Sequence, residues 1–260
     1  MELTCVRYEV ADHVATITLD RPEQRNPLSA QMLRELITAF TAARDDGEVR
    51  ACVLTGAGDK AFCAGADLGG FDTATTELQR HQERAAFVEL FLSIERLGKP
   101  VVAAVNGHAL AGGLGLALCC DLVIAADTAT LGTPEINVGL WPMMVMAIIG
   151  RNLPRKRAME LYLTGERIAA QRALEWGMVN RVVPRAEVLA TAQALAHTLA
   201  GKSPPIMRLG RDAFYGIDGL DIEAALRHLH TQLTLVTLTE DSREGIAAFK
   251  EKRAPEFKGR

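Results

Sequence analysis

Two glycine-containing turns, each directly after an apolar run, are the parts of this sequence whose residue types could do chemistry. The first is 60–68 (KAFCAGADL) and the second is 106–115 (NGHALAGGLG). Small residues let a ligand approach the backbone closely, and a helix start leaves N–H groups without internal partners. Two such N–H groups converging on one oxygen would stabilise a developing oxyanion. The glycine spacing alone fits tight strand-to-helix packing at least as well, so both interpretations stay open here.

Other chemical signatures in the chain are incomplete. Gly113-Leu-Gly115 follows an apolar run, but the third glycine of a dinucleotide fingerprint is replaced by Leu118. Gly201-Lys-Ser203 lacks the earlier glycine of a phosphate-binding loop, since position 196 is alanine, and prolines follow it. No G-x-S-x-G elbow is present, and the six histidines have no metal-ligand spacing. We therefore predict neither a bound metal nor a resident cofactor.

Composition indicates a soluble globular protein with one large or two modest cores. The 260 residues are 48% hydrophobic and 23% charged, and the formal net charge is -3. The isoelectric point of about 6.1 argues against a generic binder of polyanions. Because no block of lysine and arginine occurs, we expect no nucleic-acid partner.

The cysteines indicate a reducing compartment. They are odd in number and form no CxxC pair: Cys5, Cys52, Cys63, Cys119 and Cys120. Most lie in apolar runs, so buried reduced thiols in a cytoplasmic protein are the interpretation we favour. The first residues also lack the basic and apolar regions of a secretory signal.

One stretch, 101–120, is long and apolar enough to be compared with a membrane span. It contains Asn106, His108 and four glycines, and it runs directly into Asp121. A buried strand followed by a buried helix fits these residues better. We therefore predict no membrane insertion.

Strands alternate with helices through most of the chain. Ser29 is placed to cap a helix whose apolar residues follow helical spacing, and Gly98 with Pro100 ends a long helix over 77–97. The strands predicted from apolar runs are 15–19, 51–54, 101–105 and 122–126, with a further helix over 111–118. This alternation predicts α/β architecture with mainly parallel pairing.

After about Pro184 the pattern contains helices only. The candidates are 185–200, 205–215, 221–238 and 242–250. We therefore expect residues 1–190 to form an α/β core that carries both turns, and residues 191–260 to form a helical C-terminal part.

Several sequence blocks extend the two turns into a recognisable series. They are FCAGADL (62–68), PVVAAVNG (100–107), GG (112–113), CDL (120–122), TPE (133–135), LTGERI (163–168), EWGMVN (175–180), VVP (182–184) and TEDSREGIAAFKEKR (239–253). Together they resemble the enoyl-CoA hydratase/isomerase (crotonase) family. The match runs from about Val14 to Arg260. It implies a crotonase-type spiral core of β-β-α units and a helical C-terminal trimerisation region.

The resemblance implies where a coenzyme A thioester would bind. The two backbone N–H donors of the family's oxyanion hole fall on Ala64 and Gly112. Arg25 lies in a loop that resembles the CoA-contacting loop, and the backbone of residues 64–68, including Ala66, Asp67 and Leu68, resembles the segment that receives the adenine. For Arg25 an ordinary solvated charge is the alternative, and for Asp67 a structural role in its loop.

The family also uses a phenylalanine and a lysine of the C-terminal helix against the CoA of a neighbouring subunit. Phe249 and Lys252 are the matching residues here, with a solvated charge again the alternative for Lys252. A homotrimer, or a hexamer of paired trimers, is the assembly that the resemblance implies. Coenzyme A would arrive as part of the substrate.

The chain departs from the family at one catalytic position. Hydratases of the family usually carry two glutamates, and here Glu135 occupies one place while Gly115 occupies the other. Adding water needs one group to activate the water and one to deliver a proton, which the paired carboxylates share. A single carboxylate suits removal of a proton beside the thioester carbonyl and its return elsewhere. The apolar neighbours of Glu135 should raise its pKa towards that of a useful base.

Trp141, Pro142 and the run 143–146 would line the acyl pocket next to Glu135, together with Gly115. A methionine-rich run of this kind could equally be plain core. We expect an acyl-CoA enzyme with an enolate-like intermediate, which shifts a double bond between positions 3 and 2. The alternatives are a hydratase working with one family glutamate and a non-hydrating acyl-CoA-binding homologue.

Overall fold

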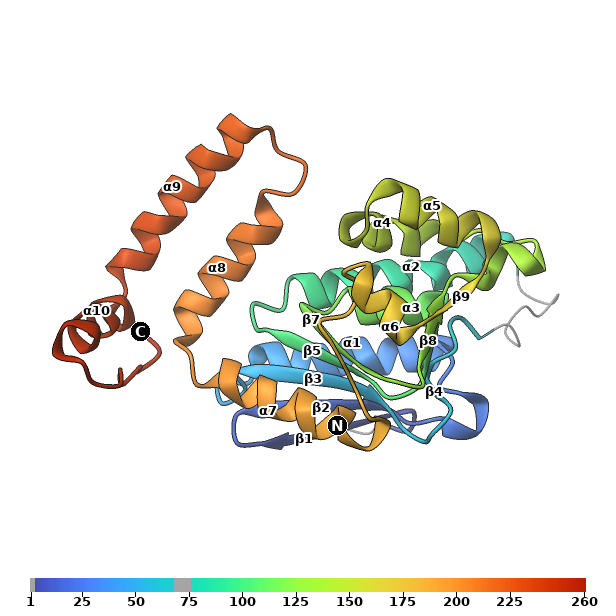
Figure 1. The fold of residues 1–260 in the computed structure, drawn as a ribbon, viewed down its shortest axis with the longest axis horizontal. Coiled ribbons are helices and arrows are strands. Elements are labelled where there is room, and N and C mark those ends of the chain that lie inside the picture. The colour runs from blue at the N-terminus through green and yellow to red at the C-terminus, as the bar shows by residue number, and fades with distance from the viewer. Residues whose placement is uncertain (1–2, 68–75) are drawn as a thin grey trace.

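The computed structural model describes residues 3–67 and 76–260, and its core contains two β-sheets surrounded by helices (Figure 1). The larger sheet has the order β1-β2-β3-β5-β7-β10, and its strands are parallel except β1. The strands are β1 (Val6–Ala11), β2 (Val14–Leu19), β3 (Ala51–Gly56), β5 (Val101–Val105), β7 (Leu122–Ala126) and β10 (Arg181–Val183). The predicted mixed α/β class with mainly parallel pairing is confirmed.

The smaller sheet consists of three-residue strands in the order β4-β6-β8-β9. They are β4 (Ala61–Cys63), β6 (His108–Leu110), β8 (Thr130–Gly132) and β9 (Arg167–Ala169). β4, β6 and β8 run parallel to one another, and β9 runs antiparallel to β8. This sheet is the part of the fold that carries the candidate site.

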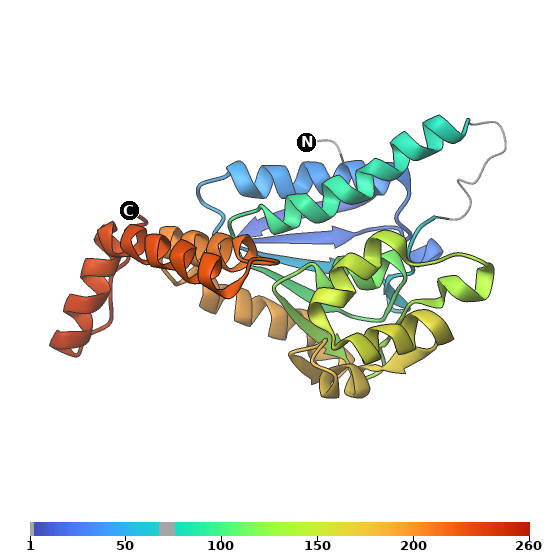
Figure 2. The ribbon, with the colours of Figure 1, turned by 90° about the horizontal axis from the view of Figure 1, so that it is seen from above.

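Helices cover the larger sheet on both sides. α1 (Ala30–Asp45) and α2 (Glu77–Glu95) pack together on one side, and α7 (Val188–Ala200) lies on the other (Figure 2). α1 begins as predicted at Ser29, whose hydroxyl accepts the N–H of Met32 at 3.2 Å. A hydroxyl cap of this kind stabilises a helix by about 1 kcal/mol.

The apolar stretch 101–120 folds as β5, β6 and α3 (Gly112–Leu118), so the predicted strand followed by a helix is confirmed. Every residue of β5 is fully buried, as expected for a central parallel strand covered on both faces. None of the helices within residues 3–67 and 76–260 has the length and hydropathy that a bilayer crossing requires.

The predicted boundary at residue 190 falls inside α7 and needs correction. α7 packs against β2, β3, β5 and β7, so it belongs to the core. The helices that leave the core are α8 (Pro204–Gly216), α9 (Ile222–Leu238) and α10 (Glu240–Glu251), which project to one side of the molecule (Figures 1 and 2). The sequence pattern marked where strands stop, but not that the first helix after them still covers the sheet.

A buried arginine holds α8 against the core. The Nε–H of Arg211 donates to both carboxylate oxygens of Asp121 at 2.9 and 3.0 Å, and another guanidinium N–H donates to the carbonyl of Ile94 at 2.8 Å. The hydroxyl of Tyr215, also on α8, donates to Asp121 at 2.7 Å. Because the Arg211 side chain is almost fully buried, these bonds hold it in place against little competition from water.

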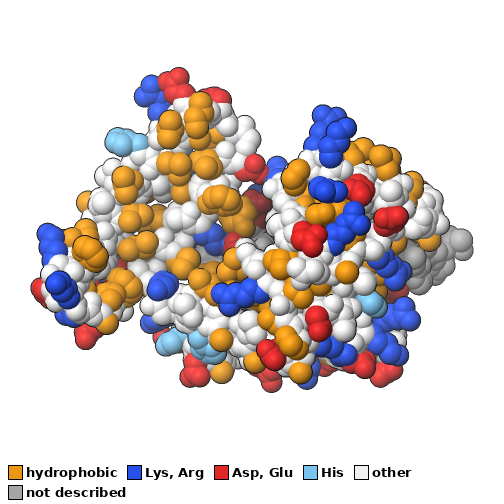
Figure 3. Space-filling view, viewed as in Figure 1, with side chains coloured by type: hydrophobic (Ala, Val, Ile, Leu, Met, Phe, Trp, Pro, Cys, Tyr) orange, Lys and Arg blue, Asp and Glu red, His pale blue; other side chains and the backbone are white. Residues whose placement is uncertain are grey.

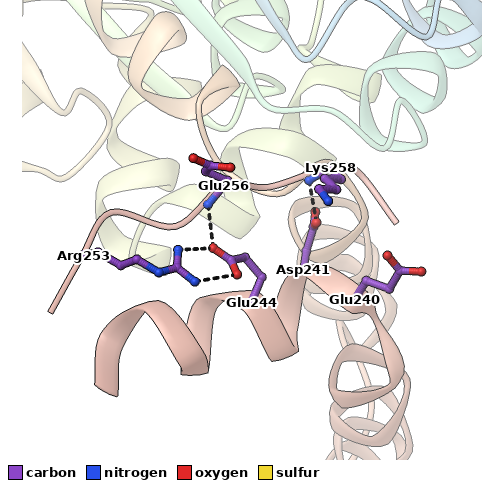
Figure 4. A pocket seen from close by; sticks show the side chains of 6 residues that line it. All are labelled: Glu240, Asp241, Glu244, Arg253, Glu256 and Lys258. Atoms are coloured by element: carbon purple, nitrogen blue, oxygen red, sulfur yellow. Dashed lines mark hydrogen bonds and ion pairs between the residues drawn. The ribbon is translucent and has the colours of Figure 1, made fainter. Parts of the chain in front are cut away.

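The C-terminal residues fold back on α10 through two acidic side chains (Figure 4). Glu244 accepts two N–H groups of Arg253 at 2.6 and 2.9 Å. Asp241 accepts the hydroxyl of Ser203 at 2.6 Å and the amide of Lys258 at 2.7 Å. These contacts tie the start of α8, the start of α10 and the last residues together.

The projecting helices expose many large apolar side chains, which are visible as orange patches in Figure 3. On α8 to α10 they are Phe214, Ile222, Leu226, Leu233, Leu235, Leu238, Ile246 and Phe249. An apolar surface of this extent on a globular protein is typical of an interface with another protein.

Candidate active site

Three adjacent parallel strands of the smaller sheet end at one edge, and the segment after each carries part of the candidate site. β6 lies between β4 and β8, with Ala109 opposite Leu131 and Leu110 opposite Gly132. The segments that follow are 64–67, 111–115 and 133–135. Ligand sites in parallel sheets lie beyond the carboxyl ends of the strands, so this edge is the expected place for one.

The first turn has four backbone N–H groups, and three of them are engaged within the chain. The amide of Ala64 donates to the carbonyl of Arg25 at 3.0 Å, and that of Asp67 donates to the carbonyl of Leu28 at 3.3 Å. The amide of Gly65 contacts the thiol of Cys63. The prediction that Ala64 is an oxyanion donor is therefore wrong, because its N–H is already used to hold the loop.

The remaining amide of this turn belongs to Ala66. Ala66 forms a parallel bridge with Leu28, in which the amides of Leu28 and Asp67 make the hydrogen bonds, so the N–H of Ala66 points away from Leu28. A Cβ built on Gly112 would lie 3.7 Å from the nitrogen of Ala66, so the two amides are neighbours. Gly65 has φ of +100°, a region that favours glycine. The chain therefore turns at Gly65, and the N–H groups of Ala64 and Ala66 point in different directions.

The second turn presents Gly112 as the first residue of α3. The amides of Leu114 and Gly115 both donate to the carbonyl of Ala111, at 3.0 and 3.2 Å, so the helix does not use the N–H of Gly112. Ala111 has φ of 53° and ψ of −126°, a conformation that costs alanine about 1–3 kcal/mol. The amide of Ala111 donates to the carbonyl of Gly132 at 2.9 Å, which fixes the turn to the end of β8.

The loop 21–28 supports the first turn through Asn26, a residue whose role the sequence reasoning missed. Asn26 is fully buried, and its side-chain amide donates to the carbonyls of Ala57 and Ala61 at 2.9 and 3.0 Å. Its side-chain oxygen accepts the amide of Arg21 at 2.9 Å. Arg25 beside it has φ of 65°, and its carbonyl thereby reaches Ala64. Asparagine tolerates the left-handed region, which is the one signal that could have indicated a structural turn here.

Glu135 follows β8 in a short 3₁₀ helix, η3 (Pro134–Val138). Its Oε2 atom is buried and has no hydrogen-bond partner within the described residues. Burial raises the pKa of this carboxyl above its ordinary value, although its own backbone N–H acts in the opposite direction. A carboxylate oxygen that is desolvated and unpaired is a strong proton acceptor, so the predicted rise of the Glu135 pKa has structural support.

Gly115 lies at the first turn of α3, and its open side is filled by neighbouring helices. Phe91 of α2 and Val145 of α4 (Met143–Asn152) approach the position where a side chain would begin. Val145 lies in the run 143–146 that the sequence placed in an acyl pocket, whereas Phe91 was predicted only as an apolar position of a long helix. The space beside position 115, where the sequence resemblance implied a second glutamate in hydratases, is thus apolar and packed in this chain.

The residues predicted to contact coenzyme A are spread over the molecule. Arg25 is exposed, and the carboxylate of Asp67 lies 3.6 Å from the guanidinium of Arg21. Leu68 lies outside the described residues. Phe249 and Lys252 lie at the end of α10, which is on the opposite side of the molecule from β4 (Figure 1). Within one chain they cannot share a site with Ala66, so their predicted role needs a neighbouring subunit and stays a prediction.

Trp141 and Pro142 connect η3 to α4. The amide of Leu140 donates to the carbonyl of Glu135 at 3.0 Å, which brings this connection back beside the glutamate. Pro142 is buried, and Trp141 packs edge-to-face on Tyr162 of α5 (Arg155–Thr164) with ring centroids 6.2 Å apart. Their predicted place in an acyl pocket is compatible with this position and stays a prediction.

Two other groups near the strands are structural. The five cysteines are free and buried, as predicted, and burial raises the pKa of Cys63 to about 12, so it is no nucleophile. His108 pairs with the hydroxyl of Thr130 at 2.8 Å at the start of β6, away from the ends that carry the site. Burial and the charges of Arg167 and Arg25 lower the pKa of His108, which favours its neutral form.

Two hollows of the described surface lie elsewhere. One of about 300 Å³ is the charged pocket beside α10, where the acidic and basic groups already pair with one another (Figure 4). The other, of about 480 Å³, lies between the end of α3 and α8 and includes Asp121 and Tyr215. No cluster of three or more potential metal-ligating side chains occurs among residues 3–67 and 76–260.

The segments after the three strand ends thus contain two adjacent amides that the described backbone hydrogen bonds do not use, and a glutamate whose carboxylate is desolvated. A family model described as enoyl-CoA hydratase/isomerase matches residues 9–260. The chain therefore belongs to the enoyl-CoA hydratase/isomerase family, whose members act on acyl-CoA, and the recognition made from its sequence blocks is confirmed.

Individual relatives agree with the family match. A Thermus thermophilus protein provisionally named enoyl-CoA hydratase is 42% identical over 94% of this chain and 97% of its own length. The 2,3-dehydroadipyl-CoA hydratase of Escherichia coli is 36% identical over 95% and 96%. A crystal structure of enoyl-CoA hydratase from Bacillus anthracis superposes with a TM-score of 0.93 at 37% identity, covering 99% of this chain and 100% of that one. The crotonase-type fold is thereby confirmed.

Proposed function

We propose that this protein isomerises enoyl-CoA thioesters, moving a double bond from position 3 to position 2. Two features together carry the proposal. Glu135 is desolvated, with an Oε2 atom that lacks a partner among the described residues, and position 115 is a glycine. One carboxylate is sufficient to carry a proton between two carbons of the substrate. Two are the usual means of holding and activating a water molecule in this family.

The amides of Ala66 and Gly112 are proposed as the oxyanion donors. They are adjacent across the strand ends, and the backbone pairing of the first turn and of α3 does not use them. When a proton leaves carbon 2, negative charge moves onto the thioester oxygen. Each donor aimed at that oxygen is worth about a hundredfold to a thousandfold in rate.

Glu135 is proposed to carry the proton. Its ionised Oε2 takes a proton from carbon 2 of a 3-enoyl-CoA, and the electron pair of that C–H bond delocalises onto the thioester oxygen. The electrons then return to form the double bond between carbons 2 and 3, and carbon 4 takes the proton back from Glu135. Atoms balance without water, and the carboxylate is regenerated.

Coenzyme A is proposed to lie along the loop 21–28 and the first turn, with Arg25 at a phosphate and the backbone at Ala66 and Asp67 near the adenine. Ala66 and Arg25 are exposed, so both can meet a ligand. Phe249 is 84% exposed at the end of α10. It and Lys252 would complete the CoA site of a neighbouring subunit in a trimer or a hexamer. Light scattering on the purified protein tests the assembly, and a monomer would remove Phe249 from the site.

Hydration remains a second candidate, because the relatives described above are named as hydratases. In that case Glu135 alone would activate water and return the proton. A third candidate is an acyl-CoA-binding homologue that catalyses neither reaction. Incubation with 3-enoyl-CoA and with 2-enoyl-CoA separates the three: the first predicts the 2-enoyl isomer, the second 3-hydroxyacyl-CoA, and the third binding without turnover.

The oxyanion donors are tested by replacing single backbone amides with esters, which removes an N–H and leaves the side chain. An ester at residue 66 should lower kcat by about a hundredfold or more. The matched control is an ester at residue 64, whose N–H holds the Arg25 carbonyl, and which should change stability more than kcat. Equal losses of kcat at the two positions would contradict the assignment of Ala66.

A further inference from the structure

The space beside Gly115 is closed by two side chains from different helices. A Cβ at this position would lie 3.0 Å from Cγ1 and 3.3 Å from Cγ2 of Val145, and 3.2 Å from Cζ of Phe91. Ordinary contacts of a Cβ atom begin at about 3.4 Å, so even a methyl group would be crowded here. A longer side chain would have to displace one of these two residues.

Val145 and Phe91 are themselves held in place. Each side chain is almost fully buried, with 6% of its residue surface exposed. α4, which carries Val145, packs along α3, and the thiol of Cys119, directly after α3, donates to the carbonyl of Phe91 at 3.4 Å. The closure is thus part of the packed core, and rearranging it would cost packing energy.

We infer that Val145 and Phe91 determine which reaction this protein catalyses, by filling the space that a second carboxylate and its bound water would need. The inference rests on the proposed function, in that Glu135 is the proton carrier. Hydration adds a hydroxyl group to carbon 3 and a proton to carbon 2, so a water molecule must stand beside the substrate. With the space beside Gly115 occupied by hydrocarbon, proton transfer through Glu135 remains available while this route for water is closed.

Because of this packing, replacing Gly115 alone would not make room for a second carboxylate. A Gly115→Glu substitution would restore the carboxylate but leave Val145 in its path. A Val145→Ala substitution removes Cγ1 and Cγ2, which are two of the three nearest atoms, and leaves an alanine that α4 accommodates. Both substitutions together are needed to reopen the space and to furnish it with a second carboxylate.

The test compares four proteins: the wild type, Gly115→Glu, Gly115→Glu with Val145→Ala, and Gly115→Glu with Val188→Ala. Val188 is a fully buried valine on α7, across the larger sheet from α1, so its truncation removes the same volume at a distance. Each protein is incubated with 2-enoyl-CoA, and 3-hydroxyacyl-CoA is measured by chromatography. Isomerisation of 3-enoyl-CoA and circular dichroism are recorded for each protein in parallel.

The variant with Gly115→Glu and Val145→Ala should form 3-hydroxyacyl-CoA at least about a hundredfold faster than the other three, which is the low end of what general acid–base catalysis contributes. Hydration by the wild type at a rate comparable to its isomerisation would overturn the inference. So would a folded variant that contains both substitutions, still isomerises 3-enoyl-CoA and fails to hydrate. If that variant does not fold, Gly115→Asp with Val145→Ala needs less room and replaces it, and its failure to hydrate has the same consequence.

The outcomes separate this inference from the proposed function. A wild type that neither isomerises nor hydrates, together with a reopened variant that hydrates, refutes the proposed isomerase and supports the role of Val145. A wild type that isomerises, together with a Gly115→Glu, Val145→Ala variant that only isomerises, supports the proposed isomerase and refutes the role of Val145.

Discussion

Replacing Glu135 with glutamine tests its proposed role as the base, because removing the desolvated carboxylate should lower the reaction rate and raise the stability of the folded protein. Glutamine keeps the shape of the side chain but cannot accept a proton. The isomerisation rate should fall by about 10²–10⁴-fold, the range that a positioned general base contributes. Since the base must be ionised, the wild-type rate should rise with pH along a limb that lies above 4.5, the ordinary pKa of a glutamate.

The sign of the stability effect follows from the direction of the Glu135 pKa. Burial raises this pKa in the folded protein, so the folded state binds the proton more tightly than the unfolded chain does. The contribution to stability is therefore present below the unfolded pKa and is lost as the pH rises through the folded pKa. At neutral pH the wild type carries the cost of an ionised, unpaired oxygen, and Glu135→Gln does not.

The size of this effect can be bounded from the burial of Glu135. An unpaired buried acceptor costs about 1–3 kcal/mol, and a charged one costs more. Glu135 is only partly buried and glutamine keeps a polar group there, so the lower end of the range applies. A gain of about 1 kcal/mol corresponds to a rise in Tm of about 2–4 °C for a chain of this size.

Thermal unfolding at a series of pH values and steady-state kinetics on the same preparations measure both effects. The control is Glu166→Gln, an exposed glutamate in the nearby turn before β9, which should change neither rate nor Tm. The reasoning is refuted if Glu135→Gln lowers Tm at neutral pH, or if its difference from the wild type is the same below pH 4.5 as above it.

Three further predictions concern packing and backbone. In urea unfolding, Gly115→Ala and Val145→Ala should couple by about 0.5–3 kcal/mol, because Val145 crowds the methyl group added at 115 and the alanine at 145 makes room for it. Additive effects would show that the contact is loose. Arg211→Met should destabilise the protein by about 3 kcal/mol because it leaves Asp121 without its cation, and a loss below about 1 kcal/mol would contradict this. Ala111→Gly should leave Tm unchanged or raise it, as relief of about 1–3 kcal/mol of strain outweighs the added freedom of the unfolded chain, and a clear fall in Tm would show that the alanine is not strained.

The longer elements could be predicted from the sequence because their signals are local. Ser29 caps α1, and Gly98 and Pro100 prevent α2 from continuing, so the predicted end at residue 97 lies two residues beyond the observed end at Glu95. β5 was predicted with the bounds that it has, because five apolar residues stand between that proline and Asn106. Such signals need no knowledge of distant contacts.

The elements that carry the site are the ones that the sequence concealed. β4, β6 and β8 are three residues long, which is too short for an alternating pattern to show. Their pairing depends on long-range contacts instead. The turns after them were found through glycine content, which marks close backbone approach without giving the direction of any amide.

The assignment of the oxyanion donor to Ala64 shows what glycine content cannot predict. Ala64 and Ala66 are both alanines in the same turn, and composition cannot distinguish them. The choice depends on Gly65, whose positive φ redirects the chain, and on Arg25, whose carbonyl takes the N–H of Ala64. The loop that supplies this carbonyl is about forty residues away in the sequence, so only the folded backbone decides which amide is left for a ligand.

The oxyanion hole cannot by itself decide between isomerisation and hydration, because both reactions place negative charge on the same thioester oxygen. The amides of Ala66 and Gly112 would serve either one equally. The decision must therefore lie with the groups that face carbons 2 to 4, where a proton moves in one reaction and a water molecule attacks in the other. In the proposed site those groups are one desolvated glutamate and the hydrocarbon surface of Val145 and Phe91. If the inference holds, two chains with the same backbone differ in reaction through the side chains that surround position 115, so relatives named as hydratases are compatible with the proposed isomerase.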